Sequence, residues 1–196
     1  MPVSISTSTV VLQAFRAMEL PGPSSLSEDS QEGRAAAEHY DTALDLCLEA
    51  ADWSFASEVV ALAQLATPAG ARDPRLPFSF ALPMQALVLR EIVTAETRHR
   101  VDGRVVRCDR SGPILARVTT RLRDETAMPA TFRTAVALQL AGLLAPQFVE
   151  VQSKVALLLD RQQEALARAA RTDARTASPA GFMGELASDW ATEARW

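Results

Sequence analysis

The chain has 196 residues, of which 48% are hydrophobic and 22% are charged, with a formal net charge of −4 and an isoelectric point near 5.3. This composition is typical of a folded globular protein and excludes the disordered and fibrous classes. A chain of this length can bury a core without disulfides or metal ions, so we expect one domain. The mild acidity argues against a dedicated duplex-DNA binder, whose domain is normally basic.

Membrane insertion and secretion are not expected from this sequence. The longest apolar runs, such as residues 155–159, are far shorter than the roughly 20 residues that cross a bilayer, and the N-terminus does not resemble a signal peptide. Cys47 and Cys108 are far apart, and neither has a second Cys or a His near it at metal-ligand spacing. They are predicted to be free thiols, which fits a cytoplasmic compartment.

Helical periodicity predicts four helices, at residues 7–20, 28–52, 129–145 and 150–175. The first carries its apolar residues three and four positions apart, and Ser27 or Ser30 could cap the second. Pro146 is expected to end the third helix. The fourth is expected to pack antiparallel to the third through a single stripe of residues. That stripe comprises Val151, Val155, Leu158, Leu159, Gln162 and Leu166.

Residues 57–123 show the alternation typical of strands. Residues 87–93 read as a strand, and the Asp102-Gly103 dipeptide predicts a hairpin at about residues 97–108. Residues 114–122 read as a further strand with one apolar and one charged face. The expected fold class is therefore mainly α with a small antiparallel β part. It is a helical bundle with inserted strands over residues 1–178 and an extended C-terminal tail over residues 179–196.

Three short patterns, taken in order, resemble a known family. The first is residues 40–56, a leucine-rich helix that ends in Trp-Ser-Phe-Ala. The second is Phe-Ser-Phe-Ala-Leu-Pro at residues 78–83, followed by the strand to Val93. The third joins the hairpin, the strand to Leu122 and an acidic turn that leads through a Pro to a Phe at residues 124–132. In this order, over roughly residues 7–175, they resemble the head–tail adaptor proteins of tailed phages, also called connectors, head-completion proteins or tail tubular protein A.

The sequence departs from the family pattern in two places. Family members often have Pro where Ala51 or Asp52 stands, and an acidic residue where this chain has Met84 and Gln85. Neither departure removes a functional group on which the resemblance depends.

The resemblance implies a mostly helical structural protein of the virion, located at the head–tail interface after assembly in the cytoplasm of the host bacterium. It implies a homo-oligomeric ring, a dodecamer, that docks onto the portal protein, contacts a tail, nozzle or stopper protein and lets DNA pass. It implies no cofactor, no metal, no catalytic residue and no membrane partner.

An arginine cluster is the most informative local feature. Residues 96–123 contain eight arginines and three acidic residues, which gives this segment a charge of +5 and leaves −9 on the rest of the chain. The segment could be a solvated sheet face, a surface that meets an acidic surface of a neighbouring subunit, or a surface that faces DNA in the lumen of a ring. The candidate basic patch comprises Arg98, Arg100, Arg107, Arg117, Arg121 and Arg123.

The C-terminal segment carries Phe182, Leu186 and Trp190 four residues apart, and Trp196 ends the chain. Such a stripe either folds back on the helices of its own chain or docks on a partner. We expect these four residues to dock into the portal.

Catalytic signatures do not emerge from the sequence. His39 and His99 read as surface or boundary residues, and Glu28, Asp29 and Glu32 read as charges at the start of a helix. The chain is therefore predicted not to be an enzyme. The alternative to a connector is a bacterial nucleic-acid-binding or scaffold protein that uses the arginine-rich hairpin.

Overall fold

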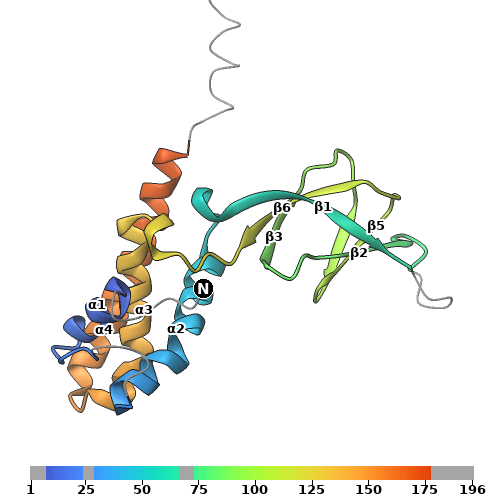
Figure 1. Cartoon of the computed structure of the whole chain (residues 1–196). Helices are drawn as coiled ribbons and strands as arrows, with labels where there is room; N and C mark the ends of the chain where they lie inside the picture. The colour runs from blue at the N-terminus through green and yellow to red at the C-terminus, as the bar shows by residue number, and fades with distance from the viewer. Residues whose placement is uncertain (1–7, 24–28, 67–72, 178–196) are drawn as a thin grey trace, which may run out of the picture.

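The structure, a computed structural model of the chain, describes residues 8–23, 29–66 and 73–177. Over these residues a helical lobe and a sheet lobe lie side by side (Figure 1). The helical elements are α1 (Thr9–Ala17), α2 (Gln31–Ala50), α3 (Ala130–Phe148) and α4 (Gln152–Thr176), with the short 3-10 helices η2 (Ser54–Ala56) and η3 (Glu125–Ala127). The strands are β1 (Ser57–Leu65), β2 (Phe78–Ala81), β3 (Ala86–Ile92), β4 (His99–Asp102), β5 (Val105–Cys108) and β6 (Ile114–Thr120).

The expected fold class, a mainly helical bundle with a small β part, is wrong. The described residues form a mixed α/β fold in which the six strands build one antiparallel sheet that is nearly a barrel. The sequence had indicated strands in residues 57–123, but not that β1 and β2 would join the others. Pairing of β1 with β6 joins residues 52 to 62 positions apart, and local periodicity carries no information on contacts at that separation.

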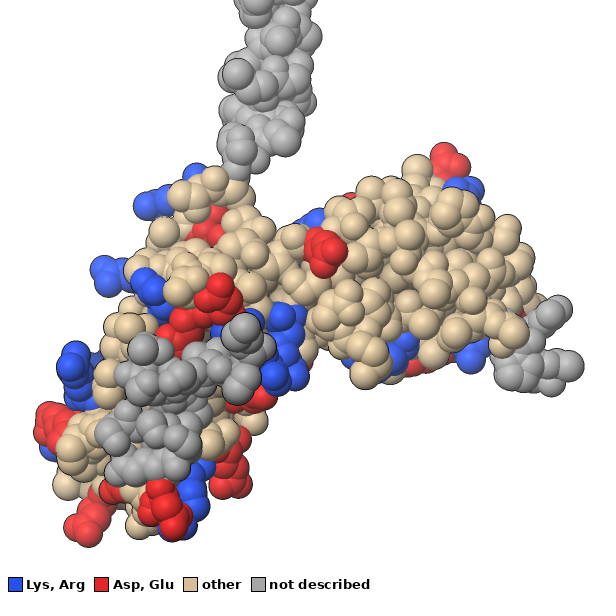
Figure 2. Space-filling model, viewed as in Figure 1, with Lys and Arg blue, Asp and Glu red and all other residues tan. Residues whose placement is uncertain are grey.

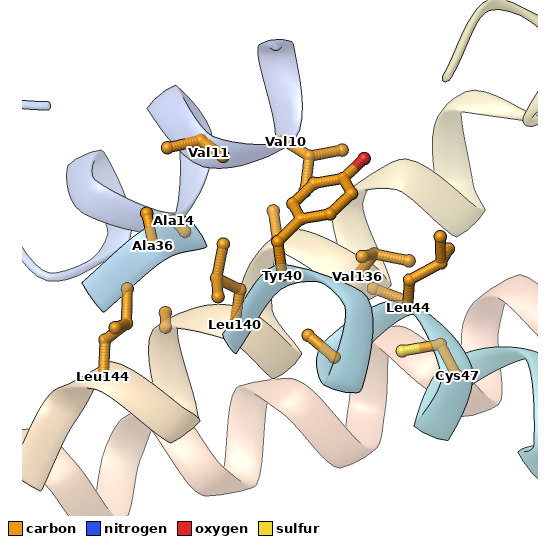
Figure 3. Close-up of a cluster of buried hydrophobic side chains, with 14 of the residues drawn as sticks. Val10, Val11, Ala14, Ala36, Tyr40, Leu44, Cys47, Val136, Leu140 and Leu144 are labelled. Atoms are coloured by element: carbon orange, nitrogen blue, oxygen red, sulfur yellow. The ribbon is translucent and has the colours of Figure 1, made fainter. Parts of the chain in front are cut away.

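The helical lobe is built around α3. Side chains of α1, α2 and α4 pack against it, and its buried residues lie on several sides because it is covered from several directions. Figure 3 shows Val10, Tyr40 and Leu140, from three different helices, meeting in this core. The apolar stripe predicted for the first helix is confirmed, since all of its residues are buried, namely Val10, Val11, Ala14, Phe15 and Met18.

Two expectations about the last helices are wrong in detail. Pro146 lies inside the final turns of α3 rather than ending it, because the helix continues to Phe148. The predicted stripe of α4 is correct in part, because Leu158 is buried, Val155 and Leu166 pack against the core and Gln162 bonds to Gln139 of α3, whereas Val151 and Leu159 are exposed. The antiparallel packing of α3 and α4 is confirmed, and α4 presents a wide face to solvent.

The sheet lobe has the strand order β3-β6-β1-β2-β5-β4 and a core of its own. Phe80, Val106 and Ile114 are fully buried in that core. The predicted hairpin is present as β4 and β5, but its two turn residues are Gly103 and Arg104, because Asp102 pairs with Val105 inside the ladder. Gly103 has φ +62°, a conformation that glycine adopts without strain.

No helix within residues 8–23, 29–66 and 73–177 is both long and apolar enough to cross a bilayer.

Candidate functional site at the joint between the lobes

The two lobes meet where the chain crosses between them, at residues 51–56 and 121–129. An aromatic cluster holds the first crossing. The rings of Trp53 and Phe132 lie 4.8 Å apart, centroid to centroid and edge to face, and those of Phe55 and Phe132 lie 4.9 Å apart. The Trp53 indole nitrogen donates to the carbonyl oxygen of Cys47 at 2.8 Å, so the one polar atom of this buried ring is satisfied.

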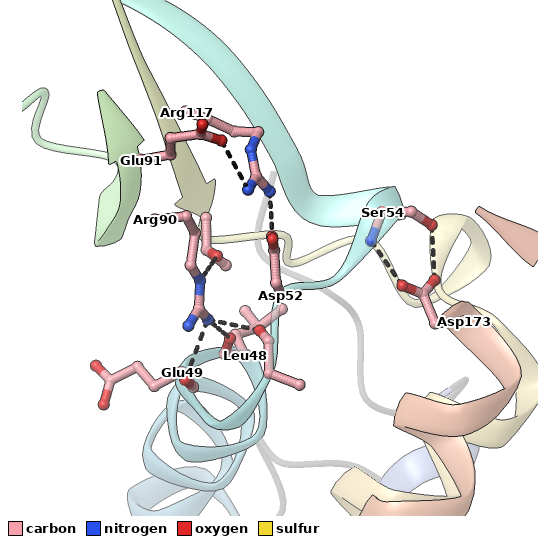
Figure 4. Close-up of polar contacts among 10 residues, drawn as sticks. Leu48, Glu49, Asp52, Ser54, Arg90, Glu91, Arg117 and Asp173 are labelled. Carbon is pink, nitrogen blue, oxygen red and sulfur yellow. Dashed lines mark hydrogen bonds and ion pairs between the residues drawn. The ribbon is translucent and has the colours of Figure 1, made fainter. Parts of the chain in front are cut away.

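A buried carboxylate ties the end of α4 to the same crossing. The backbone N–H of Ser54 donates to Asp173 Oδ2 at 2.8 Å, and the Ser54 hydroxyl donates to Oδ1 at 2.7 Å (Figure 4). The space beside the aromatic cluster measures only about 30 Å³, room for about one water molecule. This part of the joint is thus packed as a structural contact rather than shaped to hold a ligand.

Arg90 on β3 joins the sheet to the C-terminal end of α2. Its guanidinium donates to the carbonyl oxygens of Leu48 at 3.0 Å and Ala51 at 2.5 Å, and to Thr119 Oγ1 at 2.8 Å (Figure 4). The last carbonyl groups of a helix have no partner within it and carry partial negative charge, so a cation there satisfies both the hydrogen bonds and the helix dipole.

Three further arginines bind acidic residues across the joint. Arg121 makes a two-pronged contact with Asp45, and Arg123 binds Asp41 at 2.7 Å. Asp41 and Asp45 are four residues apart, hence on one face of α2, opposite the extended chain that carries the two arginines. Arg117 binds Asp52 and also Glu91, the latter at 3.2 Å, and the hydrogen bond to Asp52 raises the pKa of its guanidinium.

Glu125 organises the second crossing. Its buried carboxylate accepts hydrogen bonds from the Ser8 hydroxyl at 2.6 Å, from the backbone N–H of Thr9 at 3.1 Å and from the Tyr40 hydroxyl at 2.7 Å. It therefore places a negative charge at the N-terminal end of α1, where the helix dipole favours one. Burial, together with the hydrogen bond to Glu125, raises the pKa of the Tyr40 hydroxyl, which stays protonated and serves as a donor.

The six arginines of the predicted basic patch do not form one continuous surface. Arg117, Arg121 and Arg123 lie in the joint. Arg100 and Arg107 both bind Asp102 within the hairpin, at 2.9 and 2.7 Å, and these contacts lower the pKa of that carboxyl group. Arg98 is exposed, and its backbone N–H donates to Asp109 at 3.2 Å.

The outer face of β6 is solvated in part, because Leu115 is exposed and Arg117 is half-buried. Thr119, which the alternation placed on that face, is fully buried, and its hydroxyl accepts a hydrogen bond from Arg90, which also binds the end of α2. The acidic surface that the basic segment was expected to find on a neighbouring subunit is supplied in part by α2 of the same chain, through Asp41 and Asp45.

Sequence reasoning missed Arg90, Glu125 and Asp173 as joint residues. Arg90, with Glu91, interrupts the apolar run of β3, and Asp173 stands in an otherwise basic stretch of α4, which is the signal that could have drawn attention to them. The predicted docking residues Phe182, Leu186, Trp190 and Trp196 lie outside the described residues.

The two cysteines are free and buried, one in each core. His39 lies on α2, partly exposed, and His99 lies exposed on β4. Across the described ranges, no group of three or more His, Cys, Asp or Glu side chains is placed to hold a metal ion. Comparison of the sequence with protein-family models and with curated proteins finds no match.

Proposed function

We propose that this chain is a non-enzymatic head–tail connector of a tailed phage, a virion subunit that forms a ring, docks onto the portal protein and joins it to the tail while DNA passes. The observation that carries this proposal is the convergence of its motif residues. Trp53 and Phe55 of the first family-like pattern pack against Phe132 of the third, and Tyr40 of the first donates to Glu125 of the third. Patterns that meet in one joint are constrained together by the fold, which gives them a common structural role.

A rigid joint suits a subunit that carries load between two rings. The arginine and carboxylate contacts of the joint link the lobes at several separate points. A subunit whose lobes keep a fixed relation can present one end to the portal and the other to a neighbour or to the tail. Such a role requires surfaces rather than a catalytic cleft.

The outer face of the sheet offers a surface for a neighbouring subunit. Val59, Val93 and Leu115 are exposed by 54%, 45% and 42%. Leu115 pairs with Ala61 on β1, two residues from Val59, and its carbonyl oxygen accepts from the N–H of Val93, so the three lie close together. Figure 2 shows that the sheet lobe presents a broad face with few charged side chains. Val59 also pairs with Arg117, whose charge is matched by Asp52 and Glu91. Exposed apolar side chains grouped in this way favour self-association.

The alternative, a nucleic-acid binder that uses the arginine-rich hairpin, is less well supported. Both Arg100 and Arg107 bind Asp102, and Arg104 donates to the carbonyl oxygens of Pro83 and Ala86. A hairpin whose guanidinium groups are engaged within the chain has fewer of them to offer to phosphates.

The test is assembly with the portal protein of the same phage. We expect the free subunit to run as a monomer in size-exclusion chromatography, and to form a ring on purified portal in negative-stain images. Removal of residues 179–196 should leave a folded subunit that no longer binds the portal. A Leu115→Asp variant with its C-terminal segment intact is the matched control, which should still bind the portal but lose the closed ring.

Two results would overturn the proposal in different ways. If the intact chain does not bind the portal at any concentration tested, the connector function is wrong. If the truncated chain binds as well as the intact one, the assignment of the docking residues is wrong, although the connector function stands.

A further inference from the structure

The arginines of α4 differ from those of the joint. Arg168, Arg171 and Arg175 are exposed, and within the described part of the chain none of them takes part in an ion pair or hydrogen bond through its side chain. Arg161, near the other end of the same row, is also exposed; the pKa of the Glu19 carboxyl group is lowered mainly by Lys154 and to a smaller extent by Arg161. We call Arg161, Arg168, Arg171 and Arg175 the α4 arginine row.

The spacing of the row places its members on one face of the helix. Steps of seven, three and four residues keep all four side chains within about a quarter of the helix circumference. At 1.5 Å per residue the row extends over about 21 Å. In Figure 2 blue side chains project from the edge of the helical lobe where Figure 1 draws the C-terminal end of α4.

The row borders an open groove between α3 and α4, of about 630 Å³. Three of its arginines line the groove, together with Thr131 and Thr134 from α3. Among the residues lining this groove, Glu164 is the one acidic side chain. The lining of the groove therefore has three arginines against one acidic side chain, which leaves it with a net positive charge.

We infer that the α4 arginine row, and not the β4–β5 hairpin, is the surface of this chain that contacts the phosphate backbone of DNA. The four guanidinium groups are spread along a line instead of gathered around a point. A linear array suits a repeating polyanion better than it suits a single carboxylate or phosphate group. The location of the surface follows from the unpaired arginines, whereas the choice of DNA as the polyanion rests on the proposed function.

Contacts of this kind carry no sequence specificity, because phosphate groups are the same at every base pair. They also weaken steeply with salt, because each neutralised phosphate releases a condensed counterion. A row of exposed arginines can thus guide DNA past the subunit without holding one sequence in place. This is the behaviour that passage through a ring requires.

The test compares two double variants with the same change in charge. Arg168→Gln/Arg171→Gln removes two groups of the row, and Arg100→Gln/Arg107→Gln removes two from the hairpin. Fluorescence anisotropy follows binding to a labelled random duplex of about 30 base pairs, from about 20 to 200 mM salt. Circular dichroism verifies that both variants are folded.

We expect the intact chain to bind weakly at low salt, the α4 variant to bind about tenfold more weakly, and the slope of log affinity against log salt to fall by about two. The hairpin variant should bind within about twofold of the intact chain. Equal loss in both variants, or loss in the hairpin variant alone, would overturn the inference.

Two further outcomes distinguish a failure of the DNA-contact inference from a failure of the proposed connector function. If the intact chain assembles on the portal but does not bind duplex at low salt, the inference is wrong and the connector function stands. If the row instead binds an acidic peptide, tested with a synthetic copy of residues 178–196, and ignores duplex, its partner is a protein segment and the inference is likewise wrong.

Discussion

The helical lobe and the sheet lobe are held together by different means. In the helical core, buried side chains of α1, α2 and α4 pack around α3. The helical lobe also holds two buried carboxylates, Glu125 and Asp173, which accept hydrogen bonds from side chains of the same chain. The sheet core is smaller, and the edge strand β4 is exposed along its whole length. We therefore expect the helical lobe to supply most of the stability and the sheet lobe to depend on the joint for its position. Substitutions in the two lobes and in the joint can test this difference.

The largest effect is expected for Phe132→Ala. Phe132 is fully buried at the N-terminal end of α3 and contacts both Trp53 and Phe55. Its removal loses the burial of a large ring and leaves a cavity, so the free energy of unfolding should fall by about 3–5 kcal/mol. Urea unfolding measures the change. Phe78→Ala, at a half-buried position of the sheet, should cost clearly less, and equal costs would contradict the dominance of the helical lobe.

Glu125→Gln should destabilise the helical lobe by about 2–3 kcal/mol, because the substitution removes the charge to which Ser8, Thr9 and Tyr40 donate and leaves buried donors poorly satisfied. Thermal unfolding of the variant gives the measurement. Asp124→Asn is the matched control, since the exposed Asp124 carboxylate caps only Thr126. A loss in the control as large as that of Glu125→Gln would show that the effect does not come from burial.

Arg90→Gln should loosen the joint and cost about 1–2 kcal/mol, because the carbonyl groups at the end of α2 lose a charged donor. Hydrogen exchange should accelerate in β3 and β6 and remain unchanged in the core of α3. Arg90→Lys keeps the positive charge but loses the several donors of the guanidinium group. The free energy of unfolding of this variant should lie between those of Arg90→Gln and the native chain. Unchanged exchange in β3 would mean that the sheet lobe holds its position without this contact.

The smallest expected effect is a difference in labelling rate between the two cysteines. Both thiols are buried, so a reagent reaches each one only when its lobe opens. Cys47 lies in the helical core, where burial raises the pKa of its thiol to about 12, so almost none of it is the reactive thiolate at pH 8. Cys108 lies in the sheet core, and burial also raises the pKa of its thiol. Labelling by a thiol reagent should be slow at both and slower at Cys47. The two rates are measured separately in single-cysteine variants: Cys108→Ser keeps Cys47, and Cys47→Ser keeps Cys108. Faster labelling of Cys47 than of Cys108 would reverse the proposed order of stability of the two lobes.

Much of the secondary structure was predictable from the sequence. The residues that form α1, the start of α2 at Ser30 and the hairpin near Gly103 follow from periodicity, capping and turn chemistry, which are local. The fold class was not predictable in this way, because it depends on the pairing of β1 with both β2 and β6. The joint was not predicted: Trp53 and Phe132 were parts of two separate family-like patterns, and no contact between them or role for Arg90 and Asp173 was expected.

The uneven distribution of charge shows the difference between what the sequence determines and what the tertiary structure determines. The sequence by itself determined that a basic segment stands against an acidic remainder, because charge is a count over residues. Only the tertiary structure decided that Asp41 and Asp45 neutralise Arg123 and Arg121, while Arg168, Arg171 and Arg175 of α4 have no ion-pair partner among the described residues. The physical reason is that an ion pair forms between side chains a few ångströms apart, and the distance between residues that are about 80 positions apart in the chain is set by the packing of the two lobes.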